Sequence, residues 1–365
     1  MHAADAHNPQ EDPVRNEPEQ MGRGVPPPGR PAAGGGGWWQ QRKKRRLVLL
    51  AVALIFFGIT GASAAYYGIT RQSLFSLPGV SAMTRALPPR YVFSITGMVT
   101  PEAVAVSADG QRIYVAESGG DRLVRLYTAT GQELATLAPP GTQVSSRLPM
   151  SLALAPNGRL FVADRLRKAV DMFAPDGKYV GAYRPDAVLE EPWLPLGLSF
   201  DAGGRLLVTD HKATRHRVLV FRPNALLDTV FGEQLEGVGP LAFPYSAAVD
   251  SQGRVYVSDT NNARLLVFDA QGQLLSVVTT AEPRSGLGLP RGVAVDSQDR
   301  VYVVDAAGHT VVVYAAGDTP SFLFTFGELG TRGGELRYPS GIALDQRGRI
   351  YLADRDNNSV QVWSY

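Results

Sequence analysis

The stretch YPSGIALDQRGRIYLADRDNNSVQVWSY, residues 338–365, decides the fold. It holds three short segments rich in branched and aromatic side chains, 340–345, 350–354 and 360–363, with Gly and Asn turns between them. This composition is typical of consecutive antiparallel β-strands. No further strand follows the third one in the sequence, and a bare strand edge with unpaired N–H and C=O groups invites aggregation. We therefore expect another segment of the chain to pair with it.

The same pattern occurs six times along the chain. An acid that ends an apolar strand recurs every 46 to 49 residues, at Glu117, Asp164, Asp210, Asp259, Asp305 and Asp354. A proline that opens each unit keeps the same spacing, at Pro101, Pro149, Pro195, Pro244, Pro290 and Pro339. Because two markers keep one register, the units are repeats of one structure. Four short strands repeated about every 47 residues describe the blades of a β-propeller.

The sixth unit lacks a fourth strand, and the segment before the first unit can supply it. RYVFSITG at 90–97 matches SFLFTFGE at 321–328, the fourth strand of unit five, almost position by position. We expect 91–96 to pair beside 360–363 and close the ring. The predicted fold is all-β, a six-bladed β-propeller over 90–365 whose N-terminal strand completes the last blade.

Two units, FPYSAAVDSQGRVYVSDTNNARLLVF at 243–268 and YPSGIALDQRGRIYLADRDNNSVQVW at 338–363, carry the family resemblance most clearly. They resemble the NHL repeat, and the resemblance covers about 90–365. It implies a six-bladed propeller. It does not define a function, because the family includes binding modules and some lyase-like enzymes. NHL propellers outside the cytoplasm on a single membrane helix resemble the sensor halves of some bacterial receptor kinases, but no kinase motif occurs here.

A membrane anchor is predicted ahead of the propeller. Residues 47–70 form a run of 24 without a charge, long enough to cross a bilayer as one transmembrane helix. Five consecutive basic residues at 42–46 precede it, so the positive-inside rule places the N-terminus in the cytoplasm and the propeller outside it, at the cell membrane. The small residues 62–64 also fit a cleavage site, so removal of the anchor after Ala64 stays open.

The segments on either side of this span are predicted to carry no globular fold. Residues 1–46 are rich in Pro and Gly with almost no aliphatic side chains, which is typical of a disordered tail. Residues 71–89 are interpreted as a linker between the span and the ring. No kinase domain fits in so short a tail.

Composition narrows the chemistry. The chain has no cysteine, which excludes disulfides and thiolate metal sites. Residues 1–46 hold eight Lys and Arg against five Asp and Glu, whereas the rest holds 28 against 29. A propeller with a net charge near zero lacks the broad positive field that nucleic-acid binding needs. The sequence also contains no cofactor-binding motif.

Many polar residues recur in every blade and are interpreted as structural. An Arg begins each second strand, and in five blades an Asp lies three or four residues earlier, across the same hairpin. We expect local Asp–Arg pairs and Asx turns there. The six acids that end the second strands are expected to cap the turns that follow them.

The residues that differ between blades are the candidates for function. Directly after the opening prolines come Glu102, Met150, Leu196, Tyr245, Arg291 and Ser340, which are expected to ring one mouth of the channel. Directly after the strand-ending acids come Ser118, Arg165, His211, Thr260, Ala306 and Arg355. Two neighbouring loops are basic, DRLRK with Arg165, Arg167 and Lys168, and DHKATRHR with His211, Lys212, Arg215, His216 and Arg217.

These loops are either solvated charge or an anion-binding patch for a carboxylate, a phosphate or an acidic polymer. The predicted ligand-binding residues are Glu102, Tyr245, Arg291, Arg165, Arg167, Lys168, His211, Lys212, Arg215, His216 and Arg355. The favoured function is a binding or scaffold module for a protein, an envelope glycan or an anionic ligand. A metal-dependent lyase or lactonase would need more ligands than His211 and His309. A structural subunit of an envelope complex remains a third interpretation.

Overall fold

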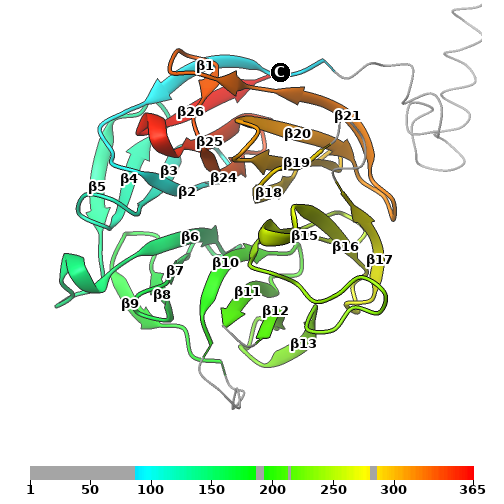
Figure 1. Ribbon diagram of the computed structural model, residues 1–365. Helices are drawn as coiled ribbons and strands as arrows, with labels where there is room; N and C mark the ends of the chain where they lie inside the picture. The colour runs from blue at the N-terminus through cyan, green and yellow to red at the C-terminus, as the bar shows by residue number, and fades with distance from the viewer. Residues whose placement is uncertain (1–86, 186–192, 213–214, 280–285) are drawn as a thin grey trace, which may run out of the picture. The chain divides into compact units, whose positions relative to one another are not determined.

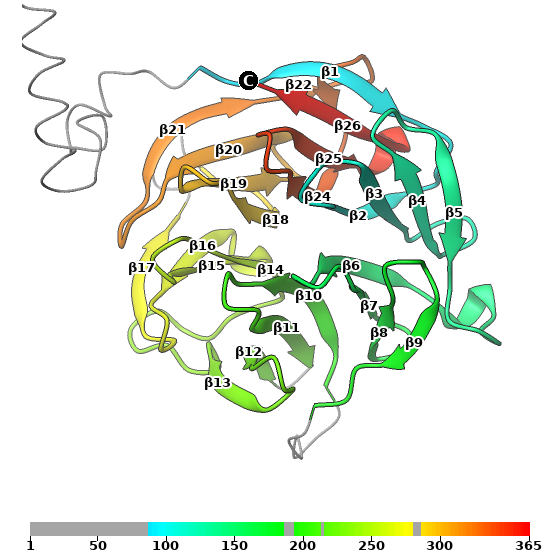
Figure 2. The ribbon, with the colours of Figure 1, turned by 180° about the vertical axis from the view of Figure 1, so that it is seen from behind.

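The computed structural model describes residues 87–185, 193–212, 215–279 and 286–365. Within them the chain forms six four-stranded antiparallel sheets around a central channel, as Figures 1 and 2 show from opposite sides. Blade 1 holds β2 (Pro101–Val106), β3 (Arg112–Glu117), β4 (Val124–Thr128) and β5 (Glu133–Leu137); blade 2 holds β6 (Pro149–Leu154), β7 (Leu160–Asp164), β8 (Ala169–Phe173) and β9 (Tyr179–Ala182); blade 3 holds β10 (Pro195–Phe200), β11 (Leu206–Lys212), β12 (Arg215–Phe221) and β13 (Leu227–Phe231).

The second half of the ring repeats this arrangement. Blade 4 holds β14 (Pro244–Val249), β15 (Val255–Asp259), β16 (Arg264–Phe268) and β17 (Leu274–Val278); blade 5 holds β18 (Pro290–Val295), β19 (Arg300–Asp305), β20 (Thr310–Ala315) and β21 (Ser321–Phe326); blade 6 holds β24 (Pro339–Leu344), β25 (Ile350–Asp354) and β26 (Ser359–Ser364). Short β22 (Glu328–Leu329) and β23 (Glu335–Leu336) pair in parallel, and 3₁₀ turns lie at Val144–Ser146, Thr260–Asn262 and Arg355–Asn357. In each blade the first strand lies at the channel and the fourth at the rim (Figure 1).

The predicted closure of the ring is confirmed. Strand β1 (Arg90–Ile95) pairs antiparallel with β26, and the sheet order is β1-β26-β25-β24. The pairing runs from Arg90 opposite Ser364 to Ile95 opposite Val360. Tyr91 packs edge-to-face on Trp363, with ring centroids 6.1 Å apart. The last strand of the sequence is therefore covered by the first strand of the ring, and no edge of blade 6 is left bare between them.

The core lies between neighbouring blades rather than within one. Every residue of β7, β15 and β25 is buried, because both faces of each second strand stack on an adjacent sheet. One such cluster joins Ile113 and Tyr127 of blade 1 to Tyr351 and Val362 of blade 6. Burying a large apolar side chain contributes about 1.5–3 kcal/mol, so this stacking holds the ring together.

The local Asp–Arg pairs are confirmed in three blades. Arg205 Nε lies 2.6 Å from Asp201, Arg254 Nε lies 2.7 Å from Asp250, and Arg300 Nε lies 2.6 Å from Asp296. In each case the same carboxylate also accepts the arginine backbone N–H, which closes the hairpin. These residues brace the hairpin turns of blades 3, 4 and 5.

The strand-ending acids do more than the sequence indicated. Capping of the following turn occurs at Asp164 and Asp305, which accept the N–H of Arg167 and Gly308. In all six blades, however, the acid accepts a backbone N–H from the crossover, by which we mean the segment directly before the opening proline of its own blade. The donors and acceptors are Val99 to Glu117, Leu148 to Asp164, Leu194 to Asp210, Ala242 to Asp259, Leu289 to Asp305 and Arg337 to Asp354. The acids therefore fix the crossovers, which lie on one face of the ring.

The N-terminal predictions lie outside the described residues. The tail 1–46, the span 47–70 and the linker up to residue 86 are not described. Among the residues that the structure describes, none forms a helix of the length and apolarity that crossing a bilayer requires.

Candidate functional site

The six residues that follow the opening prolines meet at one mouth of the channel, and we call them the mouth layer: Glu102, Met150, Leu196, Tyr245, Arg291 and Ser340. Five of them are buried, and only Arg291 is partly exposed. The sequence placed them on a ring around an opening. In the structure they fill it.

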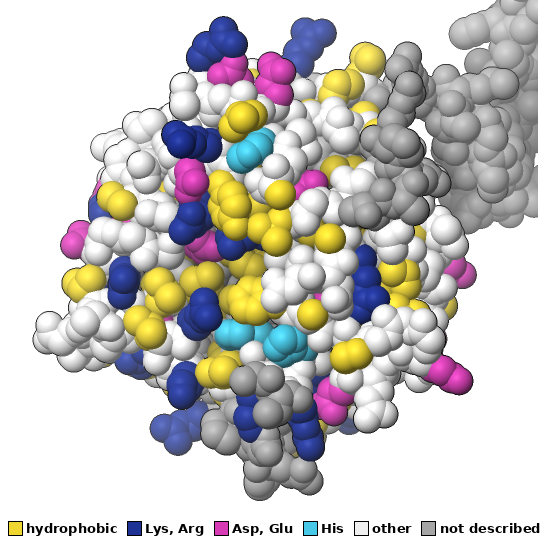
Figure 3. All heavy atoms as spheres, in the orientation of Figure 1, with side chains coloured by type: hydrophobic (Ala, Val, Ile, Leu, Met, Phe, Trp, Pro, Cys, Tyr) yellow, Lys and Arg dark blue, Asp and Glu magenta, His cyan; other side chains and the backbone are white. Residues whose placement is uncertain are grey.

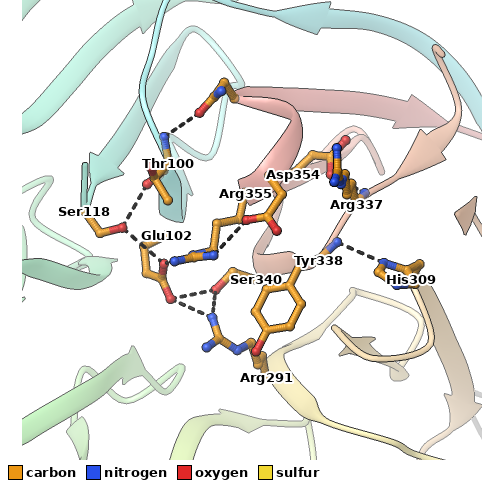
Figure 4. A network of polar contacts seen from close by, with 12 residues as sticks. Thr100, Glu102, Ser118, Arg291, His309, Arg337, Tyr338, Ser340, Asp354 and Arg355 are labelled. Atoms are coloured by element: carbon orange, nitrogen blue, oxygen red, sulfur yellow. Dashed lines mark hydrogen bonds and ion pairs between the residues drawn. The ribbon is translucent and has the colours of Figure 1, made fainter. Parts of the chain in front are cut away.

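One side of the mouth layer is a polar network centred on Glu102, seen in Figure 4. Its Oε1 accepts hydrogen bonds from the Tyr245 hydroxyl at 2.5 Å and from Arg291 Nη1 at 2.7 Å. The Ser340 hydroxyl lies 3.1 Å from the same oxygen, and Arg355 Nε donates to Oε2 at 3.1 Å. A carboxylate that is only 3% exposed is thus surrounded by donors from blades 4, 5 and 6.

The charges in this network are stabilised by one another. Burial, aided by the charge of Glu102, raises the pKa of the Tyr245 phenol far above its ordinary value, so Tyr245 stays a neutral donor. Burial opposes the charged form of Arg291, but the neighbouring Tyr245 and Glu102 raise its pKa above the usual value. Arg291 therefore remains a cation, and its Nη1 donates to Glu102 and Ser340 within the mouth layer.

The other side of the mouth layer is apolar. Met150 and Leu196 pack against the Tyr245 ring, with Leu148 and Phe243 beside them. Below the layer, the first strands of the blades enclose a channel of about 290 Å³. Because the mouth layer closes this end, a ligand approaching from this side meets the surface around the mouth rather than an open pore.

Two kinds of crossover lead into the blades. Residues Leu148, Leu194 and Leu289, directly before their prolines, give their N–H to the acid of their own blade. Thr100, Phe243 and Tyr338 occupy the same place but adopt left-handed backbone, with φ of 53°, 62° and 51°. Such conformations cost about 1–3 kcal/mol each and persist only when surrounding contacts hold them.

Side chains from the preceding blade hold the three left-handed residues. Asn358 Oδ1 accepts the N–H of Thr100 at 2.8 Å, His216 Nδ1 accepts that of Phe243 at 2.8 Å, and His309 Nδ1 accepts that of Tyr338 at 3.0 Å. We call these three residues the clamps. In His216 and His309, the ring nitrogen Nδ1 therefore accepts a backbone N–H.

The two aromatic residues held in this way lie against cations. The guanidinium of Arg165 lies 5.9 Å from the centre of the Phe243 ring, and the His211 ring meets it edge-on at 5.1 Å. The guanidinium groups of Arg291 and Arg355 lie 4.9 and 5.5 Å from the centre of the Tyr338 ring. Figure 4 shows Tyr338 beside Arg291, with its backbone directed to His309.

We use the term crossover face for the side of the ring that carries the crossovers and the loops after the second strands. Figure 3 shows it, with histidines and Lys or Arg side chains around a hydrophobic centre. The predicted basic residues are not equivalent on it. Arg165, Lys168 and Arg215 are exposed, whereas Arg167 forms an ion pair with Asp171 at 2.8 Å. Lys212 is half-buried and has contacts of its own.

His211 is a neutral group at the edge of this surface. Its Nδ1 lies 2.8 Å from the Leu194 carbonyl oxygen, which can only accept, so Nδ1 carries the proton. Burial lowers the pKa of His211, and the positive charge of Arg165 lowers it further. Within the described ranges, no three His, Asp or Glu side chains are grouped closely enough to hold a metal ion.

Phe243 and Tyr338 were not among the residues predicted from the sequence. Both precede an opening proline, where the other blades have Leu or Thr, and that aromatic substitution was the available signal. The residues that the structure places around these two rings, Arg165, Arg291, Arg355 and His211, were predicted from the sequence.

Comparisons with known proteins agree with the fold. The family model for the NHL repeat matches 241–268, 287–314 and 336–363, which confirms the resemblance in blades 4, 5 and 6. No curated protein matches the chain significantly.

Several solved structures share the architecture. A virginiamycin B lyase from Staphylococcus aureus is 12% identical, with a TM-score of 0.54 over 76% of this chain and 99% of the lyase. A gluconolactonase from Xanthomonas campestris is 16% identical, with a TM-score of 0.57 over 76% of this chain and 95% of that one. A protein of unknown function from Bacteroides thetaiotaomicron is 14% identical, with a TM-score of 0.57 over 78% of this chain and 73% of its own. Identities this low show the fold alone.

Proposed function

We propose that this chain, a six-bladed β-propeller with NHL repeats matched in blades 4, 5 and 6, is a binding module whose crossover face takes an anionic ligand. In this proposal residues 47–70 anchor the ring to the cell membrane and the ring lies outside the cytoplasm. The support for the anchor is the uncharged run and the basic residues before it. A rigid ring on one span presents a broad face to ligands of the cell envelope.

A single observation carries the proposal. Arg165 is exposed on the crossover face and forms no ion pair with any described residue, whereas its loop neighbour Arg167 is paired with Asp171. It lies over the Phe243 ring, which orients the guanidinium without neutralising it. An oriented, unpaired guanidinium is suited to bind a carboxylate or phosphate group with two hydrogen bonds.

The surroundings of Arg165 strengthen this positive site. Lys168 and Arg215, on the loops of blades 2 and 3, are also exposed. The one buried carboxylate of the mouth, Glu102, is already matched by Arg291 and Arg355. Negative charge near the site is therefore largely neutralised, and the exposed basic groups are left for a ligand.

The test is a charge reversal with a matched control. Full-length protein in nanodiscs of zwitterionic lipid is titrated with tripolyphosphate and with tetragalacturonate by calorimetry. Arg165→Glu combined with Arg215→Glu should weaken binding of at least one probe by tenfold or more. The control, Arg159→Glu combined with Arg347→Glu, makes the same charge change at exposed hairpin positions and should leave binding unchanged.

The cytoplasmic basic residues 42–46 are the same in all these variants, so their contribution cancels. Equal losses in both double variants would mean that only net charge matters. Absence of binding by the wild-type protein to either probe would refute the anion-binding proposal.

A further inference from the structure

The left-handed backbone of the two aromatic crossover residues is not needed to close the ring. Leu148, Leu194 and Leu289 show that an ordinary crossover needs no left-handed residue. A bulky residue with positive φ is an outlier, and strained backbone of this kind concentrates at functional sites. At Phe243 and Tyr338 the strain is held by a histidine and brings a large ring to the surface around the mouth.

Each of the two aromatic side chains lies beside at least one arginine guanidinium. Phe243 has Arg165 beside it, and Tyr338 has Arg291 and Arg355. Both rings are only half-buried, so part of each remains accessible. The Tyr338 hydroxyl has no hydrogen-bond partner among the described residues, and it can donate to a ligand or accept from one.

We propose that Phe243 and Tyr338 are stacking platforms for the sugar rings of an acidic glycan, and that a carboxylate of this glycan pairs with Arg165 beside Phe243. This inference rests on the proposed function and names its ligand class. A uronic acid has an apolar ring face and a carboxylate on the same rigid ring, so it matches an aromatic ring beside a guanidinium. A phosphate group matches only the guanidinium, and an acidic peptide carries its carboxylates on flexible chains.

The spacing of the platforms favours an oligomer. Phe243 enters blade 4 and Tyr338 enters blade 6, with all of blade 5 between them. One sugar cannot cover two rings separated by a whole blade, whereas a chain of uronates can lie across the mouth layer from one platform to the other. The buried Glu102 stays paired with its arginines beneath such a chain.

The experiment uses substitutions that change no charge. Phe243→Leu and Tyr338→Leu, singly and together, are compared with the wild type in full-length protein in nanodiscs, using tetragalacturonate, tripolyphosphate and the neutral maltotetraose as probes. We expect tetragalacturonate binding to fall tenfold or more in the double variant, tripolyphosphate binding to change less than twofold, and maltotetraose to bind no variant. Tyr365→Leu is the control, because Tyr365 has Arg300 at 4.0 Å from its ring but lies away from the mouth.

A second pair of variants tests the presentation of Tyr338. His309→Ala removes the acceptor of the Tyr338 N–H and should weaken tetragalacturonate binding. His309→Asn should retain it, because Asn358 occupies the equivalent left-handed position and accepts the Thr100 N–H with its side-chain oxygen. Thermal unfolding confirms that each variant is folded before its binding is compared.

The outcomes separate this inference from the proposal beneath it. Binding of tripolyphosphate but not tetragalacturonate by the wild type overturns the glycan assignment and leaves anion binding intact. Equal loss of both probes in the leucine variants also overturns it, since the rings would then serve only to orient arginine. Unchanged tetragalacturonate binding in the double leucine variant does the same. Binding of neither anion refutes the proposed function itself.

Discussion

Replacing Glu102 with alanine tests whether the mouth layer holds the ring together. Glu102 is 3% exposed and accepts hydrogen bonds from Tyr245 and Arg291 while also pairing with Arg355. Its removal leaves the guanidinium of Arg291, whose side chain is 15% exposed, without a carboxylate partner. Breaking a buried ion pair by deleting one partner costs about 3–5 kcal/mol, because the remaining charge is still buried.

The other contacts of Glu102 change this figure little. Tyr245 and Ser340 keep their mutual hydrogen bond of 2.8 Å, and Arg355 keeps its ion pair with Asp356. We therefore expect a loss of about 3–5 kcal/mol in the free energy of unfolding. At about 2–4 °C per kcal/mol for a large domain, the Tm should fall by about 6–20 °C.

Calorimetric unfolding of the full-length protein measures the effect, and Glu133→Ala is the matched control. Glu133 also pairs with an arginine, Arg125, but its side chain is 40% exposed, so its loss should cost less than about 1 kcal/mol. Glu102→Met combined with Arg291→Met should recover most of the stability, because replacing both members of a buried pair by apolar groups is often neutral. A Glu102→Ala variant no less stable than Glu133→Ala would refute the reasoning.

Two further predictions concern pH and location. Burial and the nearby Arg165 lower the pKa of His211 below its ordinary value of 6.5. Below about pH 6.5 His211 is therefore protonated more readily in the unfolded chain than in the folded ring, so the free energy of unfolding should fall as the pH drops through this value. Arg165→Gln should raise the His211 pKa in an NMR titration, and an unmoved titration would contradict this account. Because the chain has no cysteine, Leu134→Cys on the exposed rim gives a unique thiol that a membrane-impermeant maleimide should label in intact cells. Labelling only after lysis would show that the ring is not exported.

The blades were predictable because their signals are local and repeated. The opening prolines begin the first strands, as at Pro101 and Pro149, and the acids end the second strands, as at Glu117 and Asp164. Alternation and turn residues specify each hairpin within about 20 residues of sequence. Even the long-range pairing of β1 with β26 could be predicted, because a strand without a partner and a segment without a blade were both visible.

The use of the mouth layer could not be predicted in the same way. The sequence shows that Glu102 and Arg291 hold equivalent positions in their blades, but not that their side chains meet. Whether such groups face a ligand or satisfy each other depends on the volumes of all six residues at the mouth. Here Met150 and Leu196 fill one side, so the polar groups are pressed together on the other.

The left-handed crossovers were hidden for a different reason. Residues before proline are biased toward extended backbone, so Phe243 and Tyr338 should have resembled Leu148 and Leu194. Contacts from another blade reverse that bias, since the stabilising acceptor for Tyr338, His309, is 29 residues away. The preference of residues before proline depends only on neighbouring residues, so it does not predict an acceptor such as His309 that lies close only in the folded propeller.

The two crossover types also show how the ring tolerates variation at its mouth. When the residue before proline turns left-handed, the strand-ending acid accepts the N–H one position earlier, from Ala242 rather than Phe243 and from Arg337 rather than Tyr338. The freed N–H then needs its own acceptor, which a clamp provides from the preceding blade. A single side chain at the clamp position thus supports the left-handed backbone, and the residue held there, Thr100, Phe243 or Tyr338, decides whether an aromatic ring lies at the mouth.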